Sequence, residues 1–384
     1  MIVYSEGNLL TLLRSGVEYF PALARSIEQA KTEVYFETYI FADDQTGQKI
    51  ADVLCRAAQR GVSVHVLLDG FGARDMAPTL LQRMLDAGVD VLVYRRKVSP
   101  LTLRRHRLRR MHRKITVVDG RIAFVGGINV IDDMNTPGQV PPRYDYAAQI
   151  EGPLLAPIHY EVARLWRWVA LANLYPRPRE RQAKIDVSPK GKQRAALLVR
   201  DNIRHRADIE DAYLEAIDAA CDEIIIANAY FLPGIRFRHA LARAAGRGVR
   251  VVLLLQARVE YLLLHYASRA LYGTLLDAGI EIHEYHQSFL HSKVAVIDGH
   301  WATIGSSNID PFSLMLAREA NLVVDDTTFA GELRSSLRTA MQSGTIQVAK
   351  SSWHQQSLWR KLPIWLAYSA VRVILGMVGY AEKH

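Results

Sequence analysis

Cysteine is scarce in this chain of 384 residues, and its scarcity excludes one class of protein. The two cysteines, Cys55 and Cys221, stand far apart, so no disulfide framework of the secreted type is indicated. The opening residues, MIVYSEGN, also lack the charged and then apolar order of a secretory leader. We therefore expect a protein of the reducing, cytoplasmic side of the cell, without a cleaved leader.

Long apolar runs are missing too, although the C-terminal stretch 359–380 is mostly apolar. A helix needs about 20 apolar residues to cross a bilayer, and Arg372 interrupts this stretch. Pro363 suits a helix start, and Trp and cations flank the apolar part. We predict that residues 351–384 form an amphipathic tail in the interface of the cell inner membrane, as a peripheral or monotopic attachment. A helix packed as a cap on the globular domain is the alternative.

Acidic residues are outnumbered, 39 against 48 basic ones, which gives a formal net charge of +9. The excess is concentrated between Arg95 and Lys114, where ten of twenty residues are Lys or Arg. A basic rim of this kind attracts anionic partners, and we favour an anionic membrane surface. Nucleic acid is the rival partner, and a solvated loop without a specific role is the third interpretation.

Metal-ligand spacing of His, Cys and carboxylates is absent from the sequence as well, so we expect neither a metal nor a cofactor. What the chain does contain is one pattern that occurs twice: HRKITVVDGRIAFVGGIN (112–129) and HSKVAVIDGHWATIGSSN (291–308). The second copy follows the first by 179 positions, the difference between 291 and 112. A single His-x-Lys is usually a solvated strand face, but two copies with identical internal spacing indicate a function.

Each copy is predicted to form a β-hairpin. Polar and apolar residues alternate over 111–118, which places His112 and Lys114 on one face of a strand. Asp119-Gly120 and Asp298-Gly299 are signals for a tight turn between the two strands of each hairpin. The return strands end in small residues, which allow a phosphate to approach the backbone closely.

Cleavage of a phosphodiester requires two tasks from imidazoles. One ring nitrogen attacks phosphorus, and another donates a proton to the leaving oxygen. Lysine and asparagine side chains stabilise charge on the phosphate oxygens. The candidates that the two copies supply are His112, Lys114, Asp119 and Asn129, and His291, Lys293, Asp298 and Asn308.

The two copies lie within a longer internal repeat. The matching segments are 33–41 with 223–232, 57–70 with 244–257, and 84–94 with 275–285. Each half therefore reads strand, helix, strand, helix, strand and motif hairpin, which predicts an α/β fold with a mixed, largely parallel sheet covered by helices. Tyr39 and Tyr230 end matching strands near the motifs, where they either line the pocket or pack in the core, and we favour core packing.

A stretch rich in proline and charge, 175–193, reads as a linker between the halves. The expected organisation is therefore a first half at 1–174, this linker, a second half at 194–350 and the tail at 351–384.

The doubled pattern resembles the HxK(x)4D(x)6GGxN signature of the phospholipase D superfamily. Flanking phrases resemble its two-motif cardiolipin synthase branch, of the bacterial B type: MHRK, IAFVGGIN, DYAAQIEGP, IANAYFLPG, ARAAGRGVRV and HWATIGSSNIDPFSL. The similarity runs from about residue 6 to about residue 343. It implies two phospholipase D-like α/β/α sandwich halves related by a pseudo-twofold axis, with the active site at their interface.

The resemblance also implies roles for individual residues. The motif aspartates look mainly structural in this family, and the acids that orient the imidazoles come later in each half and cross the interface. By position these acids are Asp145 and Glu319, which pairs His112 with Glu319 and His291 with Asp145. Family members commonly use the first histidine as nucleophile, which favours His112. Ser306, which replaces a glycine of the signature, is interpreted either as a hydrogen-bond donor to the phosphate or as a tolerated small residue.

The resemblance favours cardiolipin synthesis, in which two phosphatidylglycerol molecules give cardiolipin and glycerol through a phosphohistidine. Phosphatidylethanolamine is an alternative donor. A hydrolase of the same superfamily, either a phospholipase D or a nuclease, is the second hypothesis, because water and a lipid alcohol compete for one intermediate. A non-catalytic scaffold that binds anionic lipid is the third, and the two intact motifs count against it.

Overall fold

The computed structural model describes residues 2–95, 109–175, 183–201, 204–258, 262–310, 313 and 317–377. The basic segment predicted between Arg95 and Lys114 lies mostly outside these residues, as does part of the predicted linker. Residues 183–192 of that linker are described and contain no helix or strand. The division of the chain into four segments stays a prediction.

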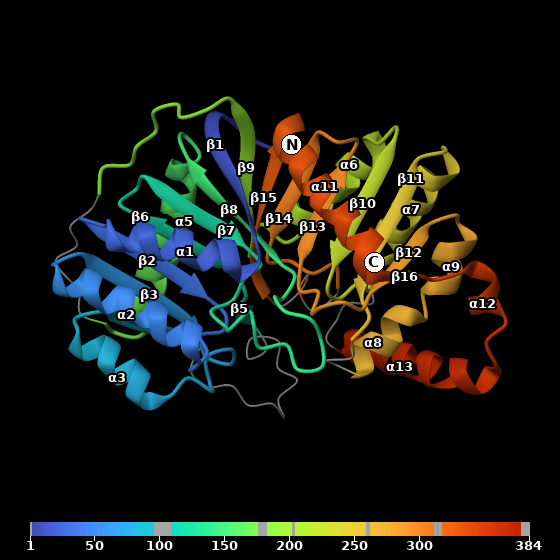
Figure 1. Ribbon diagram of the computed structural model, residues 1–384, viewed down its shortest axis with the longest axis horizontal. Helices are drawn as coiled ribbons and strands as arrows, with labels where there is room; N and C mark the ends of the chain where they lie inside the picture. The colour runs from blue at the N-terminus through green and yellow to red at the C-terminus, as the bar shows by residue number, and fades with distance from the viewer. Residues whose placement is uncertain are drawn as a thin grey trace.

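Both halves contribute strands to one continuous sheet (Figure 1). The first half supplies β1 (Ser5–Arg14), β2 (Glu33–Thr38), β3 (Ser63–Asp69), β4 (Asp90–Tyr94), β5 (Arg110–Met111), β6 (Lys114–Val118), β7 (Ile122–Gly126) and β8 (Tyr146–Glu151). The second half supplies β9 (Gln193–Arg200), β10 (Glu223–Asn228), β11 (Arg250–Gln256), β12 (Glu281–Tyr285), β13 (Lys293–Ile297), β14 (Trp301–Gly305), β15 (Ala317–Asp325) and β16 (Thr345–Gln347).

The strand order is the same in the two halves when it is read outward from the centre. The first half runs β1-β8-β7-β6-β2-β3-β4, and the second runs β9-β15-β14-β13-β10-β11-β12, with β16 at its edge. The central strands β1 and β9 pair antiparallel, which joins the halves about a pseudo-twofold axis. The predicted fold of two similar halves is thus confirmed.

The prediction of a largely parallel sheet is wrong. On the path of the sheet only the outer strands pair in parallel, β2-β3-β4 in one half and β10-β11-β12 in the other. The motif hairpin and the strand after it insert antiparallel between these strands and the centre. The outer strands β3 and β11 are buried on both faces, as their unbroken apolar runs predict.

Helices cover both faces of the sheet (Figure 1). They are α1 (Ser15–Glu28), α2 (Gln45–Gln59), α3 (Pro78–Asp86), α5 (Leu155–Ala172), α6 (Asp208–Ala219), α7 (Ile235–Gly246), α8 (Leu262–Arg269), α9 (Tyr272–Asp277), α11 (Thr327–Gly344), α12 (Lys350–His354) and α13 (Leu358–Met377). One apolar cluster lies under α1–α3, and another under α6, α7 and α9. A third extends from α5 to α11 and crosses the boundary between the halves, so the halves share a core.

The helix α13 from the predicted tail packs along α8 (Figure 1). Ile364 and Val371 are buried in the cluster of the second half, whereas the indole of Trp359 is 83% exposed. The tail therefore buries one side, as the cap interpretation predicts, and exposes apolar residues on the other. Among the described helices, α13 included, none combines the length and the apolar character needed to traverse a bilayer.

Candidate active site at the junction of the halves

The two motif hairpins form as predicted. Strands β6 and β7 pair antiparallel around Asp119-Gly120, and β13 and β14 pair around Asp298-Gly299. All four of these residues have positive φ, between 49° and 66°, as the two central residues of a type I′ turn require, and one further residue follows each turn before the return strand. Lys114 and Lys293 stand at the other end of the motif strands, where the halves meet.

The motif aspartates are not brought to the histidines. Asp119 accepts hydrogen bonds from the backbone amides of residues 31–33, at 2.8–3.0 Å. Asp298 accepts from the amides of residues 221–223, at 2.8–2.9 Å. Each carboxylate thus fixes the start of the neighbouring strand, β2 or β10, at the end of the hairpin opposite the lysine.

The predicted strand over 111–118 is interrupted at the histidine. β5 ends at Met111 and pairs with β15 of the second half, and β6 begins only at Lys114. The amide of His112, between the two strands, donates to the carbonyl of Arg318 at 2.9 Å. The amide of His291 likewise donates to the carbonyl of Tyr144 at 2.9 Å. The backbone at each histidine is therefore held by the opposite half.

The residues that follow Arg318 and Tyr144 in the sequence, Glu319 and Asp145, supply the carboxylates. Nδ1 of His112 lies 3.1 Å from both carboxylate oxygens of Glu319. Nδ1 of His291 lies 2.7 Å from Oδ2 of Asp145. The two predicted contacts are thus present in the structure. Because Nδ1 is occupied in both rings, Nε2 is the nitrogen left for chemistry at phosphorus.

Burial dominates the electrostatics of this cluster. It lowers the pKa of both imidazoles and raises that of Asp145 to about 7. Burial, with the neighbouring Lys293, lowers the pKa of Lys114 to about 7 against the attraction of Glu319. Burial therefore disfavours charged groups in this cluster, and a bound phosphate anion would favour the charged forms of the lysine and the imidazoles.

The structure gives Ser306 a contact that neither interpretation of this residue named. Its hydroxyl donates to Oε2 of Glu319 at 2.5 Å, and its carbonyl lies 3.1 Å from Nδ1 of His112. At the matching position, Gly127, a Cβ would lie only 2.5 Å from Oδ1 of Asp145. Ser306 therefore supports Glu319 through a hydrogen bond, and Gly127 leaves room for the carboxylate of Asp145.

A cavity of about 270 Å³ opens above the two imidazoles. Its lining includes five of the predicted candidates: His112, Asn129, Asp145, His291 and Asn308. Nζ of Lys114 donates to the carbonyl of His112 at 2.7 Å, and Nζ of Lys293 donates to that of His291. Oδ1 of Asn129 accepts from the amide of Ile40 at 3.2 Å, which fixes the orientation of its amide group.

Several residues of the cavity wall were not predicted. The ring of Tyr39 lies 4.7 Å from that of His112, edge on, and Tyr39 and Tyr230 both line the cavity, so the alternative to the favoured core packing is the one the structure shows. The ring of Phe289 stacks on His291, and the guanidinium of Arg143 lies 4.8 Å from the centre of the Phe289 ring. Arg143 and Phe289 each stand two positions before a predicted site residue, Asp145 or His291. This proximity becomes informative only when the two halves are known to meet at the cavity.

Metal ligands do not gather in this site. Within the part of the chain that the structure describes, no group of three or more His, Cys, Asp or Glu side chains is arranged to hold a metal ion. Arg143 is a cation of the cavity wall, whereas Lys114 and Lys293 are buried beside it and are not among the lining residues.

Comparison with known proteins gives consistent similarities. A family model described as "Cardiolipin synthase, PLD-like domain" matches residues 23–137 and 213–341. Cardiolipin synthase B of Salmonella typhimurium is 40% identical over 382 residues, which covers 99% of this chain and 92% of the relative. Cardiolipin synthase B of Escherichia coli K12 is 37% identical with the same coverage.

A solved structure supports the fold independently. The phosphatidylserine synthase of Haemophilus influenzae superposes with a TM-score of 0.67, covering 97% of this chain and 95% of its own. The sequences are only 14% identical, so this likeness concerns the fold alone.

Proposed function

This chain belongs to the cardiolipin synthase family of phospholipase D-like proteins, and we propose that it transfers a phosphatidyl group between two phosphatidylglycerol molecules. The products are cardiolipin and glycerol. The observation that carries the proposal is the pair of imidazoles at one cavity, each with Nδ1 at a carboxylate of the opposite half.

In the first step Nε2 of His112 attacks the phosphorus of the donor lipid. The bond between phosphorus and the glycerol headgroup breaks, and the imidazolium of His291 donates a proton to the departing oxygen. The phosphatidyl group is then bonded to His112. Lys114, Lys293 and the two motif asparagines stabilise the charge on the phosphate oxygens.

In the second step a hydroxyl of the acceptor's glycerol attacks the phosphohistidine. His291, now neutral, accepts the hydroxyl proton, and the bond between phosphorus and His112 breaks. Asp145 stabilises the imidazolium that His291 becomes in this step, and Glu319 stabilises the positive charge that the ring of His112 carries while it is bonded to phosphorus. Both histidines return to their starting forms.

A lipid acceptor brings a second phosphate, which water does not. Arg143 lines the cavity, held against the face of Phe289, and it adds a cation to those of the two motifs. This extra charge supports phosphatidylglycerol as acceptor over water, because a second anion at the site needs a second cation.

Attachment to the inner membrane from the cytoplasmic side is proposed to use the surface of α8 and α13. Its exposed apolar residues are Leu262, Leu263, Trp359, Leu362, Trp365, Leu366 and Val373. A helix pair that exposes two tryptophans beside aliphatic side chains suits the headgroup region of a bilayer. Trp365→Asp should reduce cosedimentation with phosphatidylglycerol vesicles several-fold, and Ser335→Asp, which adds the same charge to the exposed side of α11, should not. Equal recovery of the two variants would exclude this surface.

The activity is tested with purified full-length protein in detergent and labelled phosphatidylglycerol, with the lipids resolved afterwards. Cardiolipin with released glycerol supports the proposal, and phosphatidic acid alone would establish a hydrolase instead. A parallel reaction with labelled phosphatidylethanolamine as donor identifies that alternative. Cleavage of single-stranded DNA without any lipid turnover would overturn the lipid assignment.

A further inference from the structure

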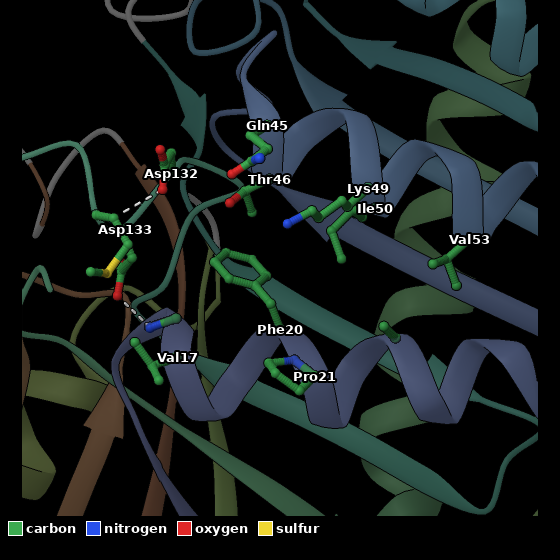
Figure 2. A pocket seen from close by; sticks show the side chains of 13 residues that line it. Val17, Phe20, Pro21, Gln45, Thr46, Lys49, Ile50, Val53, Asp132 and Asp133 are labelled. Carbon is green, nitrogen blue, oxygen red and sulfur yellow. Dashed lines mark hydrogen bonds between the residues drawn. The ribbon is translucent and has the colours of Figure 1, made fainter.

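A second cavity, of about 320 Å³, lies between α1 and α2 in the first half (Figure 2). Most of its wall is apolar, with Val17, Phe20, Pro21, Ile50 and Val53 facing the space. Polar groups gather at one end, where Asp132 and Asp133 stand (Figure 2). The volume falls in the range of small-molecule sites, and the separation of apolar and polar ends suits an amphiphile.

The polar end of this groove is shared with the candidate active site. Asp133 lines both cavities, and its Oδ2 accepts from the amide of Gly16 at the start of α1, at 2.5 Å. The carbonyl of Asp133 accepts from the amide of Arg143, which lines the active-site cavity, at 2.9 Å. Burial raises the pKa of the Asp133 carboxyl to about 6, consistent with a junction that water reaches poorly. The groove therefore adjoins the active-site cavity at Asp133.

The matching place in the second half is built differently. α6 precedes β10 and α7 follows it, as α1 and α2 do for β2. Ion pairs join α6 to α7, with 3.2 Å between Asp211 and Arg236 and 2.7 Å between Asp218 and Arg243. The pair Asp218 with Arg243 has a counterpart in the first half, where Glu28 lies 2.8 Å from Arg56 at the far ends of the helices. The positions that match Asp211 and Arg236 are Pro21 and Lys49, which line the groove. The first half thus has an opening at the place where an ion pair bridges the helices of the second half.

We propose that the groove between α1 and α2 holds part of an acyl chain of a phospholipid whose phosphate lies between the two motifs. This inference rests on the proposed function, and it adds the position of one acyl chain of the lipid substrate. The occupant is an acyl chain rather than a headgroup because most of the wall beyond Asp133 is apolar, although Gln45, Thr46 and Lys49 add polar groups on the α2 side. Its polar end meets the active site, as an ester-linked chain requires. The chain leaves water for this wall, and burial of each methylene stabilises the complex.

The decisive variant introduces into the first half the pair of opposite charges that joins α6 to α7 in the second half. Pro21→Asp with Lys49→Arg places in the groove the two residue types that α6 and α7 carry at the matching positions, and Pro21 is exposed and tolerates a polar side chain. The matched control is Asp211→Ala with Arg236→Lys, which alters the corresponding places on α6 and α7. Turnover is compared between long-chain phosphatidylglycerol and its dihexanoyl analogue.

We expect the groove variant to lose about tenfold or more in kcat/KM on the long-chain lipid, the effect of withdrawing about two methylenes from an apolar site. Its turnover of the dihexanoyl lipid should stay within about twofold of wild type, since six-carbon chains bury few methylenes there. The control pair should leave the ratio of the two substrates unchanged. An unchanged ratio in the groove variant would overturn the proposal.

A direct readout does not depend on turnover. Phosphatidylglycerol with a photoactivatable group in one chain is irradiated with the full-length protein, and the labelled peptides are mapped. Labelling within residues 15–25 and 45–53 supports the groove, and labelling confined to other segments excludes it. If the wild-type protein makes no cardiolipin but these segments are labelled, the proposed reaction fails while the lipid groove stands.

Discussion

In the first half Gly127 faces the carboxylate of Asp145, whereas in the second half Ser306 stands at the matching place and donates to Glu319. The shorter acid approaches the backbone, and only glycine leaves room for it. The longer acid reaches its histidine with space for a hydroxyl beside it. The two halves therefore hold their imidazoles by different means, although the motifs are almost identical. A repeat of this kind preserves the geometry at phosphorus and leaves the supports free to diverge.

The largest effect should come from removing either imidazole. We expect His112→Ala and His291→Ala each to lower kcat by at least about a thousandfold, because nucleophile and proton donor are both required. Trapping the enzyme with labelled donor lipid then distinguishes the halves: the phosphatidyl adduct should be lost in His112→Ala. An adduct that persists there and disappears in His291→Ala would exchange the two roles.

A large effect should also follow from Gly127→Ser, which copies the second half into the first. The added Cβ would lie 2.5 Å from Oδ1 of Asp145, so the carboxylate must move from His291. We expect kcat to fall about a hundredfold, the usual worth of a positioned acid–base group. Melting temperature is the control, and near wild-type turnover would show that the glycine is not needed for the acid's position.

A smaller effect is expected from Ser306→Ala. Glu319 loses one charge-assisted hydrogen bond but keeps His112, which predicts about a tenfold loss in kcat. Ser306→Thr, which restores the hydroxyl, should recover much of the loss, and KM should change little in either variant. A loss confined to KM would instead assign the hydroxyl to phosphate binding.

The smallest effect concerns pH. The pKa of Lys114 is lowered to about 7, so its charge is present below pH 7 and is lost above it. We expect kcat/KM for phosphatidylglycerol to fall about fivefold between pH 7 and pH 8 as this cation is lost. Lys114→Arg keeps its charge throughout and should flatten this limb of the profile. If the limb flattens in Lys293→Arg and not in Lys114→Arg, the ionising lysine is the one in the second half.

The sequence predicted much of the local structure. Asp119-Gly120 and Asp298-Gly299 specify their turns because few other dipeptides adopt positive φ twice at low cost. The doubled motif and the repeated apolar runs were sufficient to predict two similar halves. The sequence-based prediction failed at His112, which lies outside the expected strand because its amide pairs with the other half, and in the orientation of the central strands.

The sequence by itself determined which residues are proposed for the chemistry, because His112, Lys114 and Asn129 and their counterparts recur at one spacing. The acids that support the imidazoles were named only through the resemblance to a known family. The wall formed by Tyr39 and Phe289 and the open groove between α1 and α2 were decided by the tertiary structure, because they depend on contacts between segments far apart in the chain. Spacing along a strand is local and leaves a pattern in the sequence. A contact across two half-sheets leaves none, because it depends on how their shared core packs.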